Sequence, residues 1–209
     1  MVQLIQAQNL SIVDLEEKFS LNLAESDQFF TEWVGNLPEN TDLEKQYLDR
    51  VKENYLSLVK RRLILEEMIK MVVISPLLDL VGFYRSPFYV ETETSIEIAV
   101  EDKAEIVRGR IDVLVLQHQF WLLVIESKNA GLSILTAIPQ ALVYMLANPN
   151  PERPAFGLVT NGSNFIFLKL TKQDTPQYAL SDEFTLLKRE NELYRILSVL
   201  KNLSKILSR

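Results

Sequence analysis

The feature that most constrains the fold is a short, almost wholly apolar segment near the middle of the chain. Residues 120–125 read Phe-Trp-Leu-Leu-Val-Ile, and Glu126, Ser127 and Lys128 follow directly. A run of this length is too short to span a bilayer and is typical of a strand that is covered on both faces. We therefore predict an α/β protein in which helices flank a central sheet.

Other segments supply neighbours for this strand. Residues 106–116 predict a strand that pairs antiparallel with 120–127 across a turn at Gln117-His118-Gln119. Asn161-Gly162 is a strong hairpin signal between two further apolar segments. Strands are also predicted at 88–90, 93–100, 155–160 and 165–170, and residues 3–10 fit either a short strand or a helix.

The predicted helices have recognisable ends. Thr41 and Glu44 form a capping-box pattern, Ser75-Pro76 predicts a boundary or kink, and Gly82 is placed as a C-cap. Helices are predicted at 27–33, 41–81, 133–147 and 182–208.

This order divides the chain into three parts. Residues 1–60 are expected to form a mostly helical extension packed on the core, 61–181 the core, and 182–209 a C-terminal amphipathic helix. The apolar stripe of that last helix leaves two options open, namely packing on its own domain or on a second copy in a homodimer.

Composition removes several classes of chemistry. The chain has no cysteine and a single histidine, His118, so thiolate catalysis, zinc-cysteine sites and poly-histidine metal sites are excluded. A bound metal must rest mainly on oxygen ligands, which suits Mg²⁺ or Mn²⁺. The net charge of -6 argues against a broad nucleic-acid-binding surface but is compatible with a local basic groove.

The N-terminal residues lack the basic start and apolar run of a signal peptide. Since no apolar run is long enough to cross a bilayer, a cytoplasmic location is expected.

Three residues carry the chemistry that the sequence predicts. Asp112 interrupts an apolar strand, and Glu126 and Lys128, two residues apart, share one face at the end of the next strand. Antiparallel pairing would bring the two carboxylates close together, where a divalent cation would relieve their repulsion. The same residues also fit a solvated ion pair at strand ends, worth roughly 0–1 kcal/mol.

The order of these motifs resembles a known family. Asp112…Glu126-x-Lys128 resembles the PD-(D/E)xK nuclease signature, and Gln140-Ala-Leu-Val-Tyr144 resembles its QxxxY motif. Residues 65–84 are similar to the opening helix that carries the family's first acidic residue, and 158–167 to the closing hairpin. The subgroup is the N-terminal nuclease domain of type I restriction enzyme motor subunits, including stand-alone relatives. The resemblance implies a restriction-endonuclease-like core.

The resemblance also implies roles for individual residues. Asp112, Glu126 and Glu67 would hold the metal, with Glu66 the second choice for the helix carboxylate. Lys128 would act on the attacking water. Gln140 and Tyr144, four apart on one helix face, would contact DNA or orient the site. Independently of the resemblance, four polar residues near the two strand ends fit either a phosphate path of the substrate or plain solvated charge, namely Arg108, Arg110, Lys128 and Asn129.

Two positions depart from the family pattern. Ile111 stands where the nominal motif has proline, and Pro139 falls within the predicted helix 133–147, which indicates that the helix begins near Pro139 or kinks there.

Three functions remain open on the sequence alone. The first is a Mg²⁺-dependent or Mn²⁺-dependent nuclease that hydrolyses phosphodiester bonds of DNA. The second is a nuclease-fold protein used for DNA binding or assembly with little catalysis. The third is a ribonuclease on the same fold, since no residue pattern separates RNA from DNA as the substrate.

Overall fold

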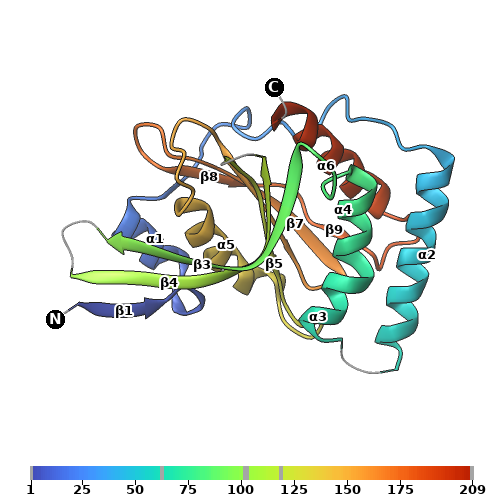
Figure 1. Cartoon of the computed structure of the whole chain (residues 1–209), viewed down its shortest axis with the longest axis horizontal. Coiled ribbons are helices and arrows are strands. Elements are labelled where there is room, and N and C mark those ends of the chain that lie inside the picture. Colours follow the sequence, from blue (N-terminus) through green and yellow to red (C-terminus); the bar gives the residue numbers. More distant parts are fainter. Residues whose placement is uncertain (1, 62–63, 101–103, 118–119, 208–209) are drawn as a thin grey trace.

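The computed structural model describes residues 2–61, 64–100, 104–117 and 120–207 of the chain. Within these residues the backbone forms a mixed β-sheet with helices on both faces (Figure 1). The strands, in chain order, are β1 (Gln3–Gln6), β2 (Asn22–Leu23), β3 (Phe88–Val100), β4 (Glu105–Gln117), β5 (Phe120–Ser127), β6 (Ala155–Thr160), β7 (Asn164–Thr171), β8 (Gln177–Leu180) and β9 (Phe184–Thr185).

The described strands join in the order β1-β4-β5-β6-β7-β8-β2, with β3 paired to β4 and β9 to β7. Strand β5 runs antiparallel to β4 and parallel to β6, so it lies inside the sheet. The predicted hairpin is present, because β6 and β7 pair antiparallel across Asn161-Gly162. These pairings confirm the predicted α/β fold with a mixed central sheet.

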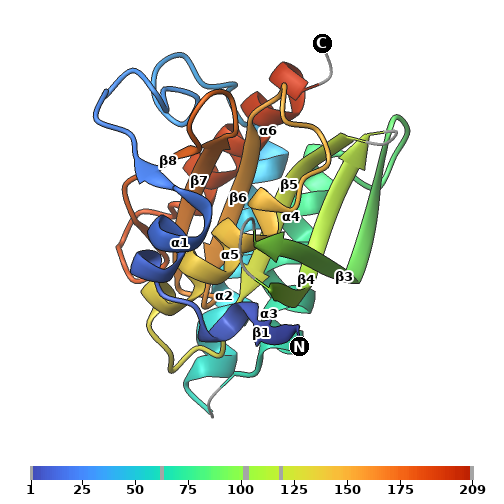
Figure 2. The same cartoon turned by 90° about the vertical axis from the view of Figure 1, so that its left-hand side faces the viewer.

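Helices cover both faces of the sheet, as the two views show (Figure 1, Figure 2). On one face lie α2 (Asp42–Val59), α3 (Glu66–Ile69), α4 (Ser75–Val81) and α6 (Leu193–Leu207), and on the other lie α1 (Ile12–Phe19) and α5 (Ala137–Leu146). Ile125 of β5 belongs to the first apolar core and Val124 to the second. The central strand is therefore buried on both faces, as its composition predicted. No helix within the described residues has the length and apolarity needed to cross a bilayer.

The predicted helix 41–81 is two helical stretches. The first, α2, starts with the predicted capping box: the Glu44 backbone N–H donates to Thr41 Oγ1 at 3.2 Å, and the Thr41 N–H donates to Glu44 Oε2 at 2.7 Å. It ends at Val59, and Arg62 and Leu63, which the prediction included, lie outside the described residues.

The second stretch runs from Glu66 to Gly82 through a π-helical segment over residues 70–74. Pro76 has no N–H to give to the carbonyl four residues earlier, and the wider π turn, in which Ser75 N–H bonds to Lys70 O, accommodates it. Gly82 ends the helix with φ 89°, which confirms its prediction as the C-cap. The kink predicted at Ser75-Pro76 is thus a change of helix type.

Two predicted helices differ from the structure. Residues 27–33 form turns, because Phe30 packs against Phe156 of the sheet with ring centroids 6.2 Å apart and Lys169 holds the Phe29 carbonyl at 2.7 Å. The C-terminal helix begins only at Leu193, whose N–H donates to Asn191 Oδ1 at 3.2 Å. The residues before it include β9, which the sequence did not predict.

The apolar stripe of α6 settles one of the options left by the sequence. Five of its large apolar side chains are buried within the chain itself, although Ile206 near its end is exposed, so the stripe gives no support for a homodimer. They are Leu193, Ile196, Leu197, Leu200 and Leu203.

The N-terminal residues contribute to the sheet as well as to its cover. Residues 3–10, left open between strand and helix, form β1 and a single 3-10 turn, and β2 adds a second short strand at the far edge. The division of the chain near residues 60 and 181 stays a prediction. The turn predicted at 117–119 falls largely on His118 and Gln119, which lie outside the described residues.

Strand β4 changes its neighbour partway along one edge. Its first residues pair in parallel with β1, ending at Gln6 opposite Arg108, and its last residues pair with β5, starting at Val113 opposite Ile125. Among the described pairings, residues 109–112 have no strand partner on that edge. The sheet therefore forks at this point.

The ribbon of β3 and β4 also bends at the fork (Figure 1). Ile111 belongs to the core beneath α5, whereas Val113 belongs to the core on the opposite face. Residues two apart in a regular strand share a face, so β4 turns between them, at Asp112. Glu93, the residue of β3 that faces this position, has φ 57°, in the left-handed region.

Candidate functional site

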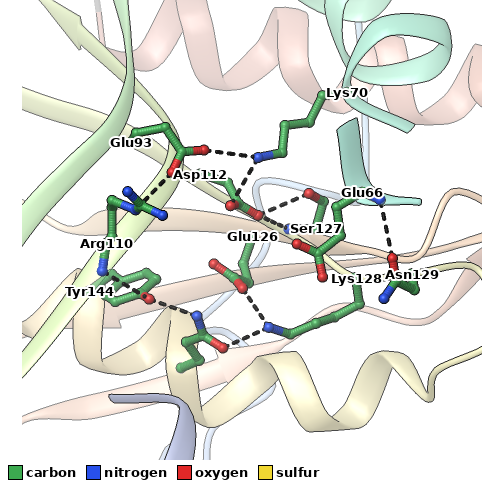
Figure 3. A network of polar contacts seen from close by, with 11 residues as sticks. Glu66, Lys70, Glu93, Arg110, Asp112, Glu126, Ser127, Lys128, Asn129 and Tyr144 are labelled. Atoms are coloured by element: carbon green, nitrogen blue, oxygen red, sulfur yellow. Dashed lines mark hydrogen bonds and ion pairs between the residues drawn. The ribbon is translucent and has the colours of Figure 1, made fainter. Parts of the chain in front are cut away.

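The fork brings together the two carboxylates that the sequence singled out. Because Val113 pairs with Ile125, Asp112 and Glu126 occupy the next position along β4 and β5. Lys128 lies just past the end of β5, where its backbone N–H donates to Thr160 O at 2.8 Å and extends the contact with β6. Its Nζ lies 2.7 Å from Glu126 Oε1. The predicted pairing thus places the three side chains in one cluster (Figure 3).

Glu126 is a carboxylate in an unfavourable position. The residue is only 2% exposed, and among the described residues its Oε2 has no hydrogen-bond partner. Burial, followed by the nearby negative charge of Asp112, raises the pKa of Glu126 to about 8, although Lys128 opposes the shift. A proton or a cation at this carboxylate would relieve the cost.

Asp112 is held firmly by its neighbours. Its Oδ2 accepts hydrogen bonds from the backbone N–H of Ser127 at 2.7 Å and from Ser127 Oγ at 2.9 Å. Its Oδ1 lies 3.1 Å from Nζ of Lys70, on the helix above. Three donors therefore fix the orientation of this carboxylate.

Gln140 and Tyr144 of α5 support the cluster through hydrogen bonds. Gln140 Oε1 accepts from Lys128 Nζ at 2.7 Å, and Gln140 Nε2 donates to the Tyr144 hydroxyl at 2.6 Å. Both side chains are buried. Gln140 thus contacts Lys128 directly and Tyr144 contacts Gln140, and their role, contact with DNA or orientation of the site, stays a prediction. Pro139 is the third residue of α5, so the helix begins close to it, as one of the two predicted options had it.

The Tyr144 hydroxyl also closes the fork. It accepts a hydrogen bond at 3.3 Å from the backbone N–H of Arg110, on the stretch of β4 without a strand partner on that edge. The ring approaches so closely because residue 109 is glycine: a Cβ there would overlap the Tyr144 ring and lie 2.9 Å from Cβ of Ala7. Burial and then the charge of Glu126 raise the pKa of Tyr144 to about 12, so the hydroxyl stays neutral.

The helix carboxylate that faces the cluster is Glu66. Its side chain is half-buried, and its pKa is raised by burial and then by the charge of Asp112. Glu67, the residue favoured by the resemblance, is exposed and lies along the same cavity. The predicted substrate residue Asn129 accepts a hydrogen bond from the Glu66 backbone N–H at 3.2 Å, so it holds the start of the helix (Figure 3).

The paired carboxylates, together with Lys128, Gln140 and Tyr144, line a cavity of about 670 Å³ at the fork. Arg110, predicted to meet substrate, is largely exposed along it, with its Nε 2.8 Å from Glu93 Oε2. The sequence did not single out Lys70, Glu93 or Ser127. The sequence contained a signal for Lys70, because this residue lies four residues after Glu66 and shares its helix face. It contained no comparable signal for Glu93. The charged side chains along the cavity are Glu66, Glu67, Lys70, Glu93, Glu97, Arg108, Arg110, Asp112, Glu126 and Lys128.

The donor atoms define what the cavity can hold. In the part of the chain that the structure describes, no group of three or more His, Cys, Asp or Glu side chains is arranged as a metal site. Asp112 and Glu126 nonetheless offer adjacent carboxylate oxygens, one of them buried and unpaired, which suits a hard cation that keeps several of its waters.

The comparisons with known proteins bear on this geometry. A solved structure from Vibrio vulnificus YJ016, assigned as a fragment of the HsdR subunit of a type I restriction enzyme, is similar over 68% of this chain and 26% of that chain, with 18% identity and a TM-score of 0.41. This chain thus spans about a quarter of the length of that one. Among curated proteins there is no match.

The family match covers most of the sheet and the site. The model described as type I restriction enzyme R protein N terminus matches residues 23–176, which is more than half of the chain. This range includes the paired carboxylates and the supporting helix α5. The chain therefore belongs to the family of type I restriction enzyme R protein N termini.

Proposed function

We propose that this chain is a divalent-metal-dependent nuclease of the PD-(D/E)xK type that hydrolyses phosphodiester bonds of DNA. The observation that carries the proposal is the unpaired, buried Glu126 Oε2 beside Asp112 at the base of an open cavity. Mg²⁺ or Mn²⁺ would be held by Asp112 and Glu126, with Glu66 close by. Such a cation, when bound, polarises a phosphodiester and lowers the pKa of its bound water.

The protein's own groups would supply positioning and charge. Lys128 is held between Glu126 and Gln140, both at 2.7 Å, so its ammonium group has a fixed place beside the carboxylates. From there it would orient the attacking water and stabilise the negative charge that builds up on the phosphate. Ser127 would keep Asp112 in place through the two hydrogen bonds to Oδ2.

The acidic protein would meet DNA through local cations. The net charge of -6 disfavours general attraction to a polyanion. Arg108 and Arg110 lie on the β4 side of the cavity and Lys70 on the helix side, so a phosphodiester that enters it would pass between them. From its family we further propose that the chain meets its DNA as part of a type I restriction system.

The test is cleavage of plasmid DNA with Mg²⁺ or Mn²⁺. Asp112→Asn and Lys128→Met should each lower the cleavage rate by at least ~100-fold, in the range seen when a positioned charge is lost from an active site. Asp79→Asn on α4, an exposed residue, and Lys45→Met on α2, whose side chain is 45% exposed, are matched controls that should cleave like the wild type. Equal rates in all variants, or no cleavage by the wild type with either metal, would reject the proposal.

The alternative role, DNA binding or assembly without catalysis, gives a different set of results. It predicts DNA binding that survives Asp112→Asn and no cleavage by any variant. Calorimetric titration with Mn²⁺ separates the two roles. Heat of binding that disappears in both Asp112→Asn and Glu126→Gln supports the enzyme, whereas unchanged heat supports the alternative.

A further inference from the structure

A second charged cluster adjoins Asp112 and joins Glu93 to Lys70 and Arg110, two of the cations along the proposed DNA path. Glu93 lies between two cations: its Oε1 is 3.1 Å from Lys70 Nζ, and its Oε2 is 2.8 Å from Arg110 Nε (Figure 3). Lys70 Nζ also lies 3.1 Å from Asp112 Oδ1. One carboxylate thus bridges an ammonium and a guanidinium group at the mouth of the candidate site.

Irregular backbone conformations position both Glu93 and Lys70 for this contact. Glu93 has φ 57° inside a strand, a strained conformation that is uncommon for residues other than Gly, Asn and Asp. Lys70 begins the π-helical segment of the helix above. Strained residues and π turns both concentrate at functional sites, and these two converge on a single side-chain contact.

Glu126, which pairs with Lys128, and Glu93, which pairs with Lys70, differ in how easily their side chains can move out to solvent. The Glu126 side chain is 3% exposed and cannot turn to solvent without disturbing the core, whereas the Glu93 side chain is 46% exposed. Ion pairs of largely exposed side chains contribute little to stability, so moving Glu93 aside costs little. Lys70, at 20% exposure, would keep Asp112 as its partner and stay in place.

We propose that Lys70 and Arg110 form a binding site for one backbone phosphate of DNA, and that Glu93 occupies this site in the DNA-free protein. A phosphate carries oxygens that can take the places of both Glu93 carboxylate oxygens, and Lys and Arg are the side chains that bind phosphate. The site adjoins Asp112, so the bound phosphate would lie next to the carboxylates of the candidate nuclease site.

This inference rests on the proposed function only for the identity of the ligand as DNA. It makes Glu93 a competitor of the substrate, so removing its charge should strengthen binding. It also assigns Lys70 to the substrate, although Lys70 touches Asp112. A plain structural ion pair would give the opposite result, because breaking it would leave binding unchanged or weaker.

The experiment measures binding of a short fluorescent DNA duplex in EDTA, so that no cleavage intervenes, over a series of salt concentrations. Glu93→Gln should bind several-fold more tightly than the wild type. Glu16→Gln, on the exposed face of α1, changes the net charge equally and is the matched control.

The double variant makes the result specific to the cluster. In Lys70→Met the gain from Glu93→Gln should shrink, because only Arg110 then remains to bind the phosphate, whereas Lys70→Arg, which keeps the charge, should retain the full gain. Melting temperatures of all variants check that each is folded. A gain in Glu93→Gln no larger than in Glu16→Gln, a gain that is undiminished in Lys70→Met, or no binding by Glu93→Gln would each overturn the inference.

Failure of this inference is distinguishable from failure of the nuclease proposal. Binding without any metal reports only on the phosphate site, and plasmid cleavage reports only on turnover. A chain that cleaves DNA but shows no coupling between Glu93 and Lys70 would lack the phosphate site. Coupling without cleavage would keep the phosphate site and reject the nuclease.

Discussion

Glu126 should make the stability of the metal-free protein fall as pH rises. Burial and then the charge of Asp112 raise its pKa from 4.5 to about 8. Between these values the folded protein holds a proton on Glu126 that the unfolded chain releases. The folded state therefore binds more protons than the unfolded state, and the free energy of unfolding decreases with increasing pH through this window. Below it, the carboxyl is protonated in both states and costs nothing.

The size of the effect follows from the shift. At about 1.4 kcal/mol for each unit, a rise from 4.5 to about 8 corresponds to at most about 5 kcal/mol, spread over the window at up to about 1.4 kcal/mol per pH unit. Glu126→Gln keeps the shape and removes the charge, so its stability should lack this slope. The new amide group lacks an evident acceptor at the position of Oε2, which adds a cost of about 1–3 kcal/mol at every pH.

Urea unfolding in EDTA, followed by circular dichroism between about pH 5 and pH 9, measures the two curves. The wild type should lose stability relative to Glu126→Gln as the pH rises to about 8, and the difference should then level off. Adding Mg²⁺ at the upper end should stabilise the wild type and leave Glu126→Gln almost unchanged. Glu16→Gln, an exposed replacement, should follow the wild-type curve.

Parallel curves for the wild type and Glu126→Gln across this range would refute the reasoning. They would mean that Glu126 is ionised in the folded protein, held as an anion by Lys128. In that case the ion pair with Lys128 at 2.7 Å would stabilise the Glu126 anion by more than burial destabilises it.

Two further predictions concern the support of the site. Gly109→Ala should lower the free energy of unfolding by about 1–3 kcal/mol, and with it the melting temperature, because the added methyl group overlaps the Tyr144 ring. An unchanged melting temperature would show that the ring can move away at no cost. Tyr144→Phe removes the hydroxyl that Gln140 and the Arg110 N–H share, so DNA cleavage should fall at least ~10-fold while the free energy of unfolding falls by only about 1 kcal/mol. A loss of cleavage no larger than the loss of folded protein in this variant would argue for a purely structural hydroxyl.

The sequence was sufficient for the centre of the fold because its signals there are local. Fourteen residues separate Asp112 from Glu126, and a short connection leaves antiparallel pairing as the natural arrangement. Side-chain alternation then fixes Glu126 and Lys128 on one face. The capping box at Thr41 and the glycine at 82 likewise act within one turn, so both were predictable.

Features that depend on distant contacts were not predictable in the same way. The segment 27–33 has a helix-like pattern, but Phe30 and Lys169 bind it to the sheet as turns. The choice between Glu66 and Glu67 depends on the rotation of a helix that changes type four residues later, at Lys70. Glu93 reaches the site through a left-handed backbone conformation in a residue that rarely adopts one.

The fork in the sheet explains why these pieces meet at one place. Between β1 and β5, four residues of β4 lack a strand partner on one edge, and an unpaired buried N–H is costly unless another group accepts it. Tyr144 meets that need at Arg110, and the same hydroxyl anchors Gln140, which in turn holds Lys128. The hydroxyl that accepts the Arg110 backbone N–H therefore also helps to position the Lys128 side chain beside Asp112 and Glu126. A substitution that repaired the edge with a regular strand partner would close the cavity and remove the site with it.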